Sequence, residues 1–147
     1  MKRFVLILAA LLLLVPAFAD GPVANPASDA MADIIAAASQ QSWLQVGAEA
    51  AMTQIDAIDP VVIDVRTQTE WDDLGHIPGA ILIPVTELNV HLDMLPTDLD
   101  TPIIVYCARG TRGNYALLFL KALGYGNVKN LSGGFGAWVA ADLPVEN

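Results

Sequence analysis

The sequence contains a single cysteine, Cys107, among 147 residues, so an intramolecular disulfide is excluded. Oxidising compartments favour paired cysteines as a source of stability, and a lone thiol is therefore either buried and inert or kept for its reactivity. Histidine is also scarce, with two residues. His91 has no Cys, Asp or Glu at a spacing that would complete a zinc motif, so we expect no metal site there.

Positive charge is the second scarcity. The chain has 7 Lys and Arg against 16 Asp and Glu, which gives a formal net charge of -9. Binding to nucleic acids or to anionic membranes depends on clustered Lys and Arg, so the composition excludes both classes of partner. A chain of this size is long enough to form one ordinary domain with its own core.

The apolar start of the chain reads as a secretory signal peptide. Basic Lys2 and Arg3 precede an apolar run over residues 4–15, and "PAFA" supplies small residues before a cleavage point after Ala19. We expect residues 1–19 to be removed and the protein to be exported to the periplasm or secreted. The remaining chain would carry 5 Lys and Arg against 16 Asp and Glu, a formal charge of -11.

A retained membrane anchor is the alternative to cleavage. A membrane span needs roughly 20 apolar residues, whereas this run is shorter and meets Pro16. No cysteine follows the run, so a lipid-anchored form is not expected. We therefore predict no stable membrane anchor after cleavage.

After a leader at 20–42, which includes a predicted helix at 29–41, short apolar runs alternate with helical patterns throughout the predicted domain, 43–147. The predicted strands are 42–46, 61–65, 80–84, 102–106 and 128–131. The predicted helices are 47–55, 67–74, 85–95, 112–123 and 133–143. Apolar strands alternating with helices predict an α/β fold, with a central parallel sheet of about five strands and helices on both faces.

The cysteine lies in "YCARGTRG", residues 106–113, between a buried strand and a helix. Ligands of open α/β sheets bind at the carboxyl ends of strands, and a helix start offers unpaired N–H groups to anions. Gly110 and Gly113 allow successive N–H groups to point inward, while Arg109 and Arg112 add full positive charge. These features favour a Cys107 thiolate that attacks an anionic substrate or accepts a group from it.

Two longer motifs resemble those of the rhodanese (thiosulfate sulfurtransferase) family. "VYCARGTRGNYALLFLKALGYGNVKNLSGGFGAW" contains a C-x-x-G-x-R loop and a closing G-G-aromatic-x-x-W segment. "VVIDVRTQTEWDDLGHIPGAILIP" matches D-V-R-x-x-x-E-aromatic followed by G-H-I-P-G-A. Both motifs stand in the expected order, and the resemblance extends from about Trp43 to Leu143.

The resemblance implies a rhodanese-like fold and a two-step sulfur transfer. Cys107 would take a sulfur atom from thiosulfate or a related small anionic donor, forming a persulfide, and pass it to cyanide or a thiol, including a thiol on another protein. The loop residues that would bind the substrate and the persulfide are Ala108, Gly110, Thr111, Arg112 and Gly113. We add Arg109 for its charge, because it occupies a variable position of the family's loop and the resemblance assigns it no role. The family requires no metal or organic cofactor for this chemistry.

Two alternatives remain beside the sulfurtransferase. A non-catalytic module of the same fold would bind persulfides, oxyanions or a partner protein, although inactive versions commonly lack the cysteine. Related phosphatases use a C-x5-R loop, one residue longer than the six residues from Cys107 to Arg112, which makes phosphatase activity the weaker alternative.

The "DVRTQTE" and "GHIPG" motifs offer further titratable side chains. In the resembling family they mainly hold the scaffold together, so we assign Asp64, Arg66, Glu70 and His76 structural roles. We expect Arg66 to pair with Glu70, because a buried ion needs its partner. His76 is expected to be a hydrogen-bonded structural histidine rather than a general base.

Overall fold

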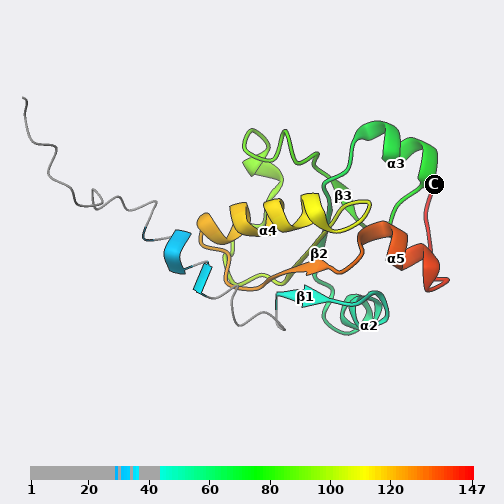
Figure 1. Ribbon diagram of the computed structural model, residues 1–147, viewed down its shortest axis with the longest axis horizontal. Coiled ribbons are helices and arrows are strands. Elements are labelled where there is room, and N and C mark those ends of the chain that lie inside the picture. Colours follow the sequence, from blue (N-terminus) through cyan, green and yellow to red (C-terminus); the bar gives the residue numbers. More distant parts are fainter. Residues whose placement is uncertain (1–28, 30, 34, 37–43) are drawn as a thin grey trace, which may run out of the picture.

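The computed structural model describes residues 29, 31–33, 35, 36 and 44–147 (Figure 1). The predicted signal peptide lies outside the described residues, as does most of the predicted leader. Of the predicted helix 29–41, the residues described up to position 36 are helical, and residues 37–41 lie outside the description. No helix in the described ranges is long and apolar enough to cross a membrane.

A five-stranded parallel sheet forms the centre of the domain, in the order β1-β5-β4-β2-β3. Its strands are β1 (Gln45–Val46), β2 (Val61–Asp64), β3 (Ile81–Leu82), β4 (Ile103–Tyr106) and β5 (Val128–Leu131). The central strand β4 is buried along its whole length, which explains its continuous run of β-branched and aromatic residues. The predicted α/β architecture is confirmed.

Helices and loops cover both faces of this sheet (Figure 1). The helices are α2 (Ala48–Ile58), α3 (Gln68–Leu74), α4 (Thr111–Ala122) and α5 (Gly134–Ala140). Leu117 and Leu120 of α4 join the core on one face, and Ala51 of α2 and Trp138 of α5 join a second core on the other. Each face of the sheet therefore carries its own buried apolar core.

The predicted helix 85–95 is wrong. This segment is a series of turns followed by the short 3-10 helix η1 (Leu92–Met94). The Val85 N–H donates to the carbonyl of Val65, so the backbone is still paired with the sheet at the point where a helix would begin. The segment also contains β-branched valines and an asparagine, which are poor helix formers. Its apolar spacing instead serves to place Leu88 and Leu95 in the core.

Candidate active site

Cys107 lies at the carboxyl end of the central strand β4, where the chain turns into α4. The residue is 2% exposed, and its Sγ accepts a hydrogen bond from the Gly110 N–H at 3.1 Å. Hydrogen bonds to a sulfur anion stabilise the thiolate, which is the nucleophilic form of cysteine. The structure therefore brings the sulfur and a backbone donor together within four residues of chain.

Gly110 closes this turn in the left-handed region, with φ of 97°. Its carbonyl accepts from the Asn114 N–H at 3.0 Å, which begins the hydrogen-bond ladder of α4. A side chain would be strained at this φ, so glycine is required for the loop to give one N–H to sulfur and one carbonyl to the helix.

The carbonyl groups of the loop are held from outside by the start of α5. The Phe135 N–H donates to the Cys107 carbonyl at 2.7 Å, and the Gly136 N–H donates to the Ala108 carbonyl at 3.0 Å. A Cβ atom on Gly134 would collide with the Cys107 carbonyl oxygen. The "GG" motif thus allows α5 to approach the loop and bond two of its carbonyls, while the Gly110 N–H donates to the sulfur.

Asn130, near the end of β5, is hydrogen-bonded to the cysteine loop. The sequence alone did not single out this residue. The residue is 1% exposed, and its Nδ2 donates to the Gly110 carbonyl at 3.0 Å and to Asn114 Oδ1 at 2.7 Å. Its Oδ1 is buried without a hydrogen-bond partner, and a Cβ on Gly113 would collide with it. The available signal was an amide side chain between Val128 and Leu131 in a short strand, because a buried amide requires partners.

The expected Arg66–Glu70 pair is wrong, because Glu70 pairs with Arg112. Arg112 donates through both terminal nitrogens to the two Glu70 carboxylate oxygens, each at 2.7 Å. Arg66 reaches Glu70 through the backbone carbonyl at 3.4 Å. The bidentate pair joins the start of α3 to the start of α4, and a sequence pattern cannot show that these two helix starts meet.

This pairing shifts the pKa of each group in the direction that keeps the group charged. The hydrogen bonds from Arg112, together with those from Thr67, lower the pKa of Glu70 from 4.5 to about 2. Glu70 in turn raises the pKa of Arg112, and the nearby Cys107 sulfur adds to that increase. Arg112 is therefore a permanent cation held beside the sulfur by a permanent anion.

Arg66 and Asp64 form a separate ion pair, in which both side chains are completely buried. The Arg66 Nε donates to Asp64 Oδ2 at 2.7 Å, and its Nη2 donates to the Gly75 carbonyl at 2.6 Å. The guanidinium also lies over the ring of Phe135, 4.1 Å from its centroid. Arg66 thus connects β2, the loop after α3 and the first turn of α5, and these contacts are those of a scaffold residue.

Tyr106, the residue before Cys107, is likewise completely buried. Its hydroxyl accepts from the Ile77 N–H at 3.1 Å, and burial together with the Asp64 carboxylate raises its pKa well above the usual range. Tyr106 therefore remains a neutral part of the scaffold.

His76 is stacked on Trp71, with the ring centroids 3.6 Å apart. Its backbone N–H and carbonyl bond with Glu146 near the C-terminus, and its Nε2 lies 3.6 Å from a Glu146 carboxylate oxygen. The Nδ1 atom is buried without a partner. The expected hydrogen bonding of His76 is therefore carried by its backbone rather than by Nδ1.

The two loop arginines differ in their surroundings. Arg112 is tied to Glu70, whereas Arg109 is exposed and its guanidinium has no hydrogen bond or ion pair with any described residue. Thr111 is exposed as well, while Gly113 is buried against Asn130. Within the described ranges, no three His, Cys, Asp or Glu side chains gather as a metal site would require.

Comparison with known proteins places this geometry in one family. Residues 47–141 match the family model of the rhodanese-like domain. A sulfurtransferase of Allochromatium vinosum is 36% identical over 90 residues, which are 61% of this chain and 81% of that protein. The thiosulfate sulfurtransferase GlpE of Pseudoalteromonas translucida is 33% identical over 87 residues, 59% of this chain and 80% of that protein.

The fold is shared as well. The crystal structure of a rhodanese-related protein from Thermoplasma volcanium has a TM-score of 0.62 and 32% identity, covering 69% of this chain and 96% of that one. A solution structure of a rhodanese-like domain from an Anabaena protein has a TM-score of 0.64 and 27% identity, covering 71% of this chain and 79% of that one. By sequence, fold and cysteine loop, this chain belongs to the family of rhodanese-like domains.

Proposed function

We propose that this protein is a sulfurtransferase that moves a sulfane sulfur from thiosulfate, or a related anionic donor, to a thiol or cyanide through a persulfide on Cys107. Family membership and relatives named as sulfurtransferases support sulfur transfer in general. The observation that carries the finer proposal is the six-residue loop from Cys107 to Arg112, whose Gly110 N–H donates to Sγ.

In the first half-reaction, the Cys107 thiolate attacks the outer sulfur of thiosulfate. The bond between the two thiosulfate sulfurs breaks, its electron pair leaves with sulfite, and the outer sulfur stays on Cys107 as a persulfide. Backbone N–H groups of residues 108–113 would surround this added sulfur. The hydrogen bonds from α5 to the carbonyls of Cys107 and Ala108 support this orientation of the loop.

Both arginines would stabilise negative charge in this step, each at a different atom. Arg109 is exposed and unpaired among the described residues, which suits it to bind the oxyanion end of the donor. Arg112 is held by Glu70 near Cys107, which suits it to stabilise negative charge on sulfur. In the second half-reaction the acceptor attacks the outer sulfur and restores the thiolate.

Intact-mass measurement after exposure to thiosulfate tests the proposal. We expect one added sulfur on the wild-type chain, its loss on addition of cyanide, and no added sulfur in Cys107→Ser. A chain that gains no sulfur and turns over no thiosulfate would be a binding module instead. Hydrolysis of an aryl phosphate that disappears in Cys107→Ser would favour the phosphatase alternative.

We also propose that the protein works after export, in the periplasm or outside the cell. The support is the basic start, the apolar run and the small residues before Asp20 in the sequence. N-terminal sequencing of the protein recovered from its host should begin at Asp20. A chain that still begins at Met1 and stays with the membrane would indicate a retained anchor.

A further inference from the structure

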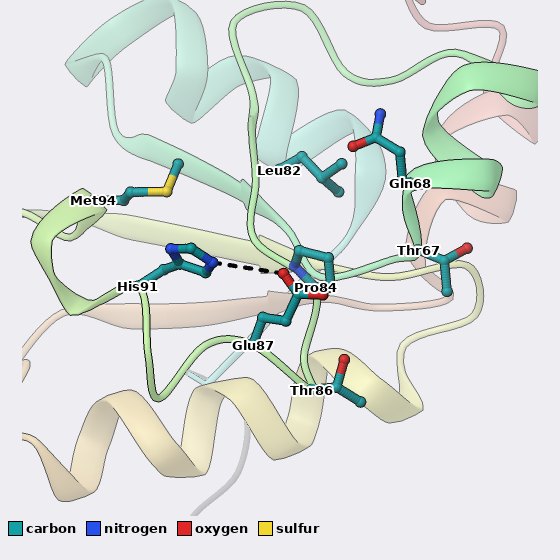
Figure 2. A pocket seen from close by; sticks show the side chains of 8 residues that line it. All are labelled: Thr67, Gln68, Leu82, Pro84, Thr86, Glu87, His91 and Met94. Carbon is teal, nitrogen blue, oxygen red and sulfur yellow. Dashed lines mark ion pairs between the residues drawn. The ribbon is translucent and has the colours of Figure 1, made fainter.

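A mixed polar and apolar pocket of about 340 Å³ is lined by residues from the start of α3, from β3 and the segment that follows it, and from η1. Figure 2 shows its lining, with Gln68 and Met94 on opposite sides and with His91 and Glu87 directed toward each other. Leu82, Pro84 and Met94 give it an apolar wall, and Gln68, Thr86 and Glu87 give it polar groups. The volume suits a small organic molecule.

Backbone hydrogen bonds place one wall of this pocket two strands away from Cys107. The Val65 N–H donates to the Tyr106 carbonyl at 2.8 Å, and the Val85 N–H donates to the Val65 carbonyl at 3.2 Å. Neighbouring strands are separated by about 4.8 Å, so the Pro84–Thr86 wall stands roughly 10 Å from the Cys107 backbone, at the same edge of the sheet. A small ligand in the pocket could therefore extend a reactive group toward the loop.

The charge of the pocket is opposite to that of the loop. None of its eight lining residues is Lys or Arg, and the one carboxylate among them belongs to Glu87. The Glu87 side chain is 55% exposed, and its Oε2 lies 3.6 Å from His91 Nε2. The loop in contrast presents Arg109 and Arg112. An anion approaching Cys107 is favoured on the loop side, and a cation is favoured on the pocket side.

We infer that this pocket binds the sulfur acceptor, and that it selects thiols that carry a positively charged amino group. This inference rests on the proposed function. The ammonium would lie at the Glu87 carboxylate and the carbon chain on Leu82 and Pro84. The acceptor thiol gives its proton to solvent, and its sulfur attacks the outer sulfur of the protonated persulfide. The bond to Sγ breaks with its electron pair going to Sγ, so the products are the acceptor hydropersulfide and the Cys107 thiolate.

Three small thiols that differ in charge test this selection. The persulfide-loaded protein is mixed with 2-aminoethanethiol, 2-mercaptoethanol or 3-mercaptopropionate, and sulfur loss is followed by mass at low ionic strength. Each thiol is compared between wild type and variant, so its intrinsic reactivity cancels. In Glu87→Gln the rate with 2-aminoethanethiol, relative to 2-mercaptoethanol, should fall about two- to fivefold, the size expected for one exposed charge pair. In Glu87→Lys the preference should pass to 3-mercaptopropionate.

Glu49→Gln is the matched control, because Glu49 is an exposed carboxylate on α2, on the other face of the sheet. An unchanged ratio in Glu87→Gln, or an equal change in Glu49→Gln, overturns the inference. Amide NMR of the unloaded protein gives a second readout, in which 2-aminoethanethiol should shift the signals of Gln68, Thr86 and His91. Shifts without any persulfide formation would refute the proposed function while supporting the site. Persulfide formation without selective shifts would refute the site.

Discussion

Arg109 and Arg112 stand three residues apart in the loop, and a carboxylate holds one of them. Arg112 is paired with Glu70 at 2.7 Å through two hydrogen bonds, whereas Arg109 is exposed. The whole chain is strongly negative, so the anionic donor proposed above would be attracted by the local charge of the loop alone. Of the two arginines, Arg109 should therefore dominate the first contact with the donor.

Replacing Arg109 with Gln should raise the KM for thiosulfate about fivefold and reduce the salt dependence of that KM, with a smaller effect on kcat. Steady-state kinetics at several salt concentrations check this. Lys129→Gln removes a cation that bonds to Gln54 on α2 and serves as the control. An Arg109→Gln enzyme with the wild-type KM would remove Arg109 from the binding site.

The pairing of Glu70 with Arg112 makes the free energy of unfolding depend on pH. Its pKa is lowered to about 2 in the folded protein, from an ordinary value of 4.5. Because the folded pKa is the lower one, the pair contributes fully to the free energy of unfolding above about pH 4.5, and the contribution is lost as pH falls toward 2. Glu70→Gln should therefore cost about 1–2 kcal/mol at pH 7, and the difference from wild type should shrink between pH 4.5 and 3. Urea unfolding across this range measures it, and a difference independent of pH would contradict the pairing.

Among the secondary-structure elements, the short helix α5 positions the cysteine loop. Gly133 and Gly134 adopt φ of 74° and 61°, and α5 then donates two N–H groups to the loop carbonyls. A Cβ on Gly134 would also lie 2.7 Å from the backbone nitrogen of Arg109. The orientation of the loop therefore depends on close contact with a helix that begins 25 residues after Arg109.

Gly134→Ala should move the loop and lower sulfurtransferase turnover at least about 100-fold, with a stability cost of about 2–3 kcal/mol. Gly47→Ala is a matched control, because Gly47 has a φ of -73° and open space where its Cβ would stand. That control should stay within about 1 kcal/mol of wild type and keep its turnover. Near-normal turnover in Gly134→Ala would show that the loop is not held by α5.

Local sequence signals predicted most of these elements, and long-range contacts account for the failures. Strand β4 is a continuous apolar run, β2 is apolar up to Asp64, and glycines mark the loop, so their positions followed from the apolar pattern and turn chemistry. The segment 85–95 has helical apolar spacing, but its backbone is hydrogen-bonded at Val85 to Val65, the residue directly after β2. Glu70 has an Arg four residues before it and another 42 residues after it, and only the folded chain shows which one it binds.

At the scale of the whole molecule, residues 144–147 are hydrogen-bonded to the loop after α3 and to α5. The His76 N–H donates to the Glu146 carbonyl at 2.8 Å, and the Glu146 N–H donates to the His76 carbonyl at 2.9 Å. The side chain of Trp138 donates to the Pro144 carbonyl at 2.7 Å. This final segment packs over Gly75, whose carbonyl also accepts from the buried Arg66.

The backbone bridge at Glu146, rather than its carboxylate, should carry the stability of this closure. Glu146→Pro removes the donor to the His76 carbonyl and should lower the free energy of unfolding by about 1–3 kcal/mol. Glu146→Ala keeps the N–H and loses a contact of 3.6 Å to His76 from a side chain that is 58% exposed, so it should cost less than about 0.5 kcal/mol. Urea unfolding of the two variants separates the contributions. Since Arg66 is bonded to the loop beneath this segment, Glu146→Pro should also show faster amide exchange at Gly75 and Ile77. Equal stability in the two variants would mean that the last residues do not brace the fold.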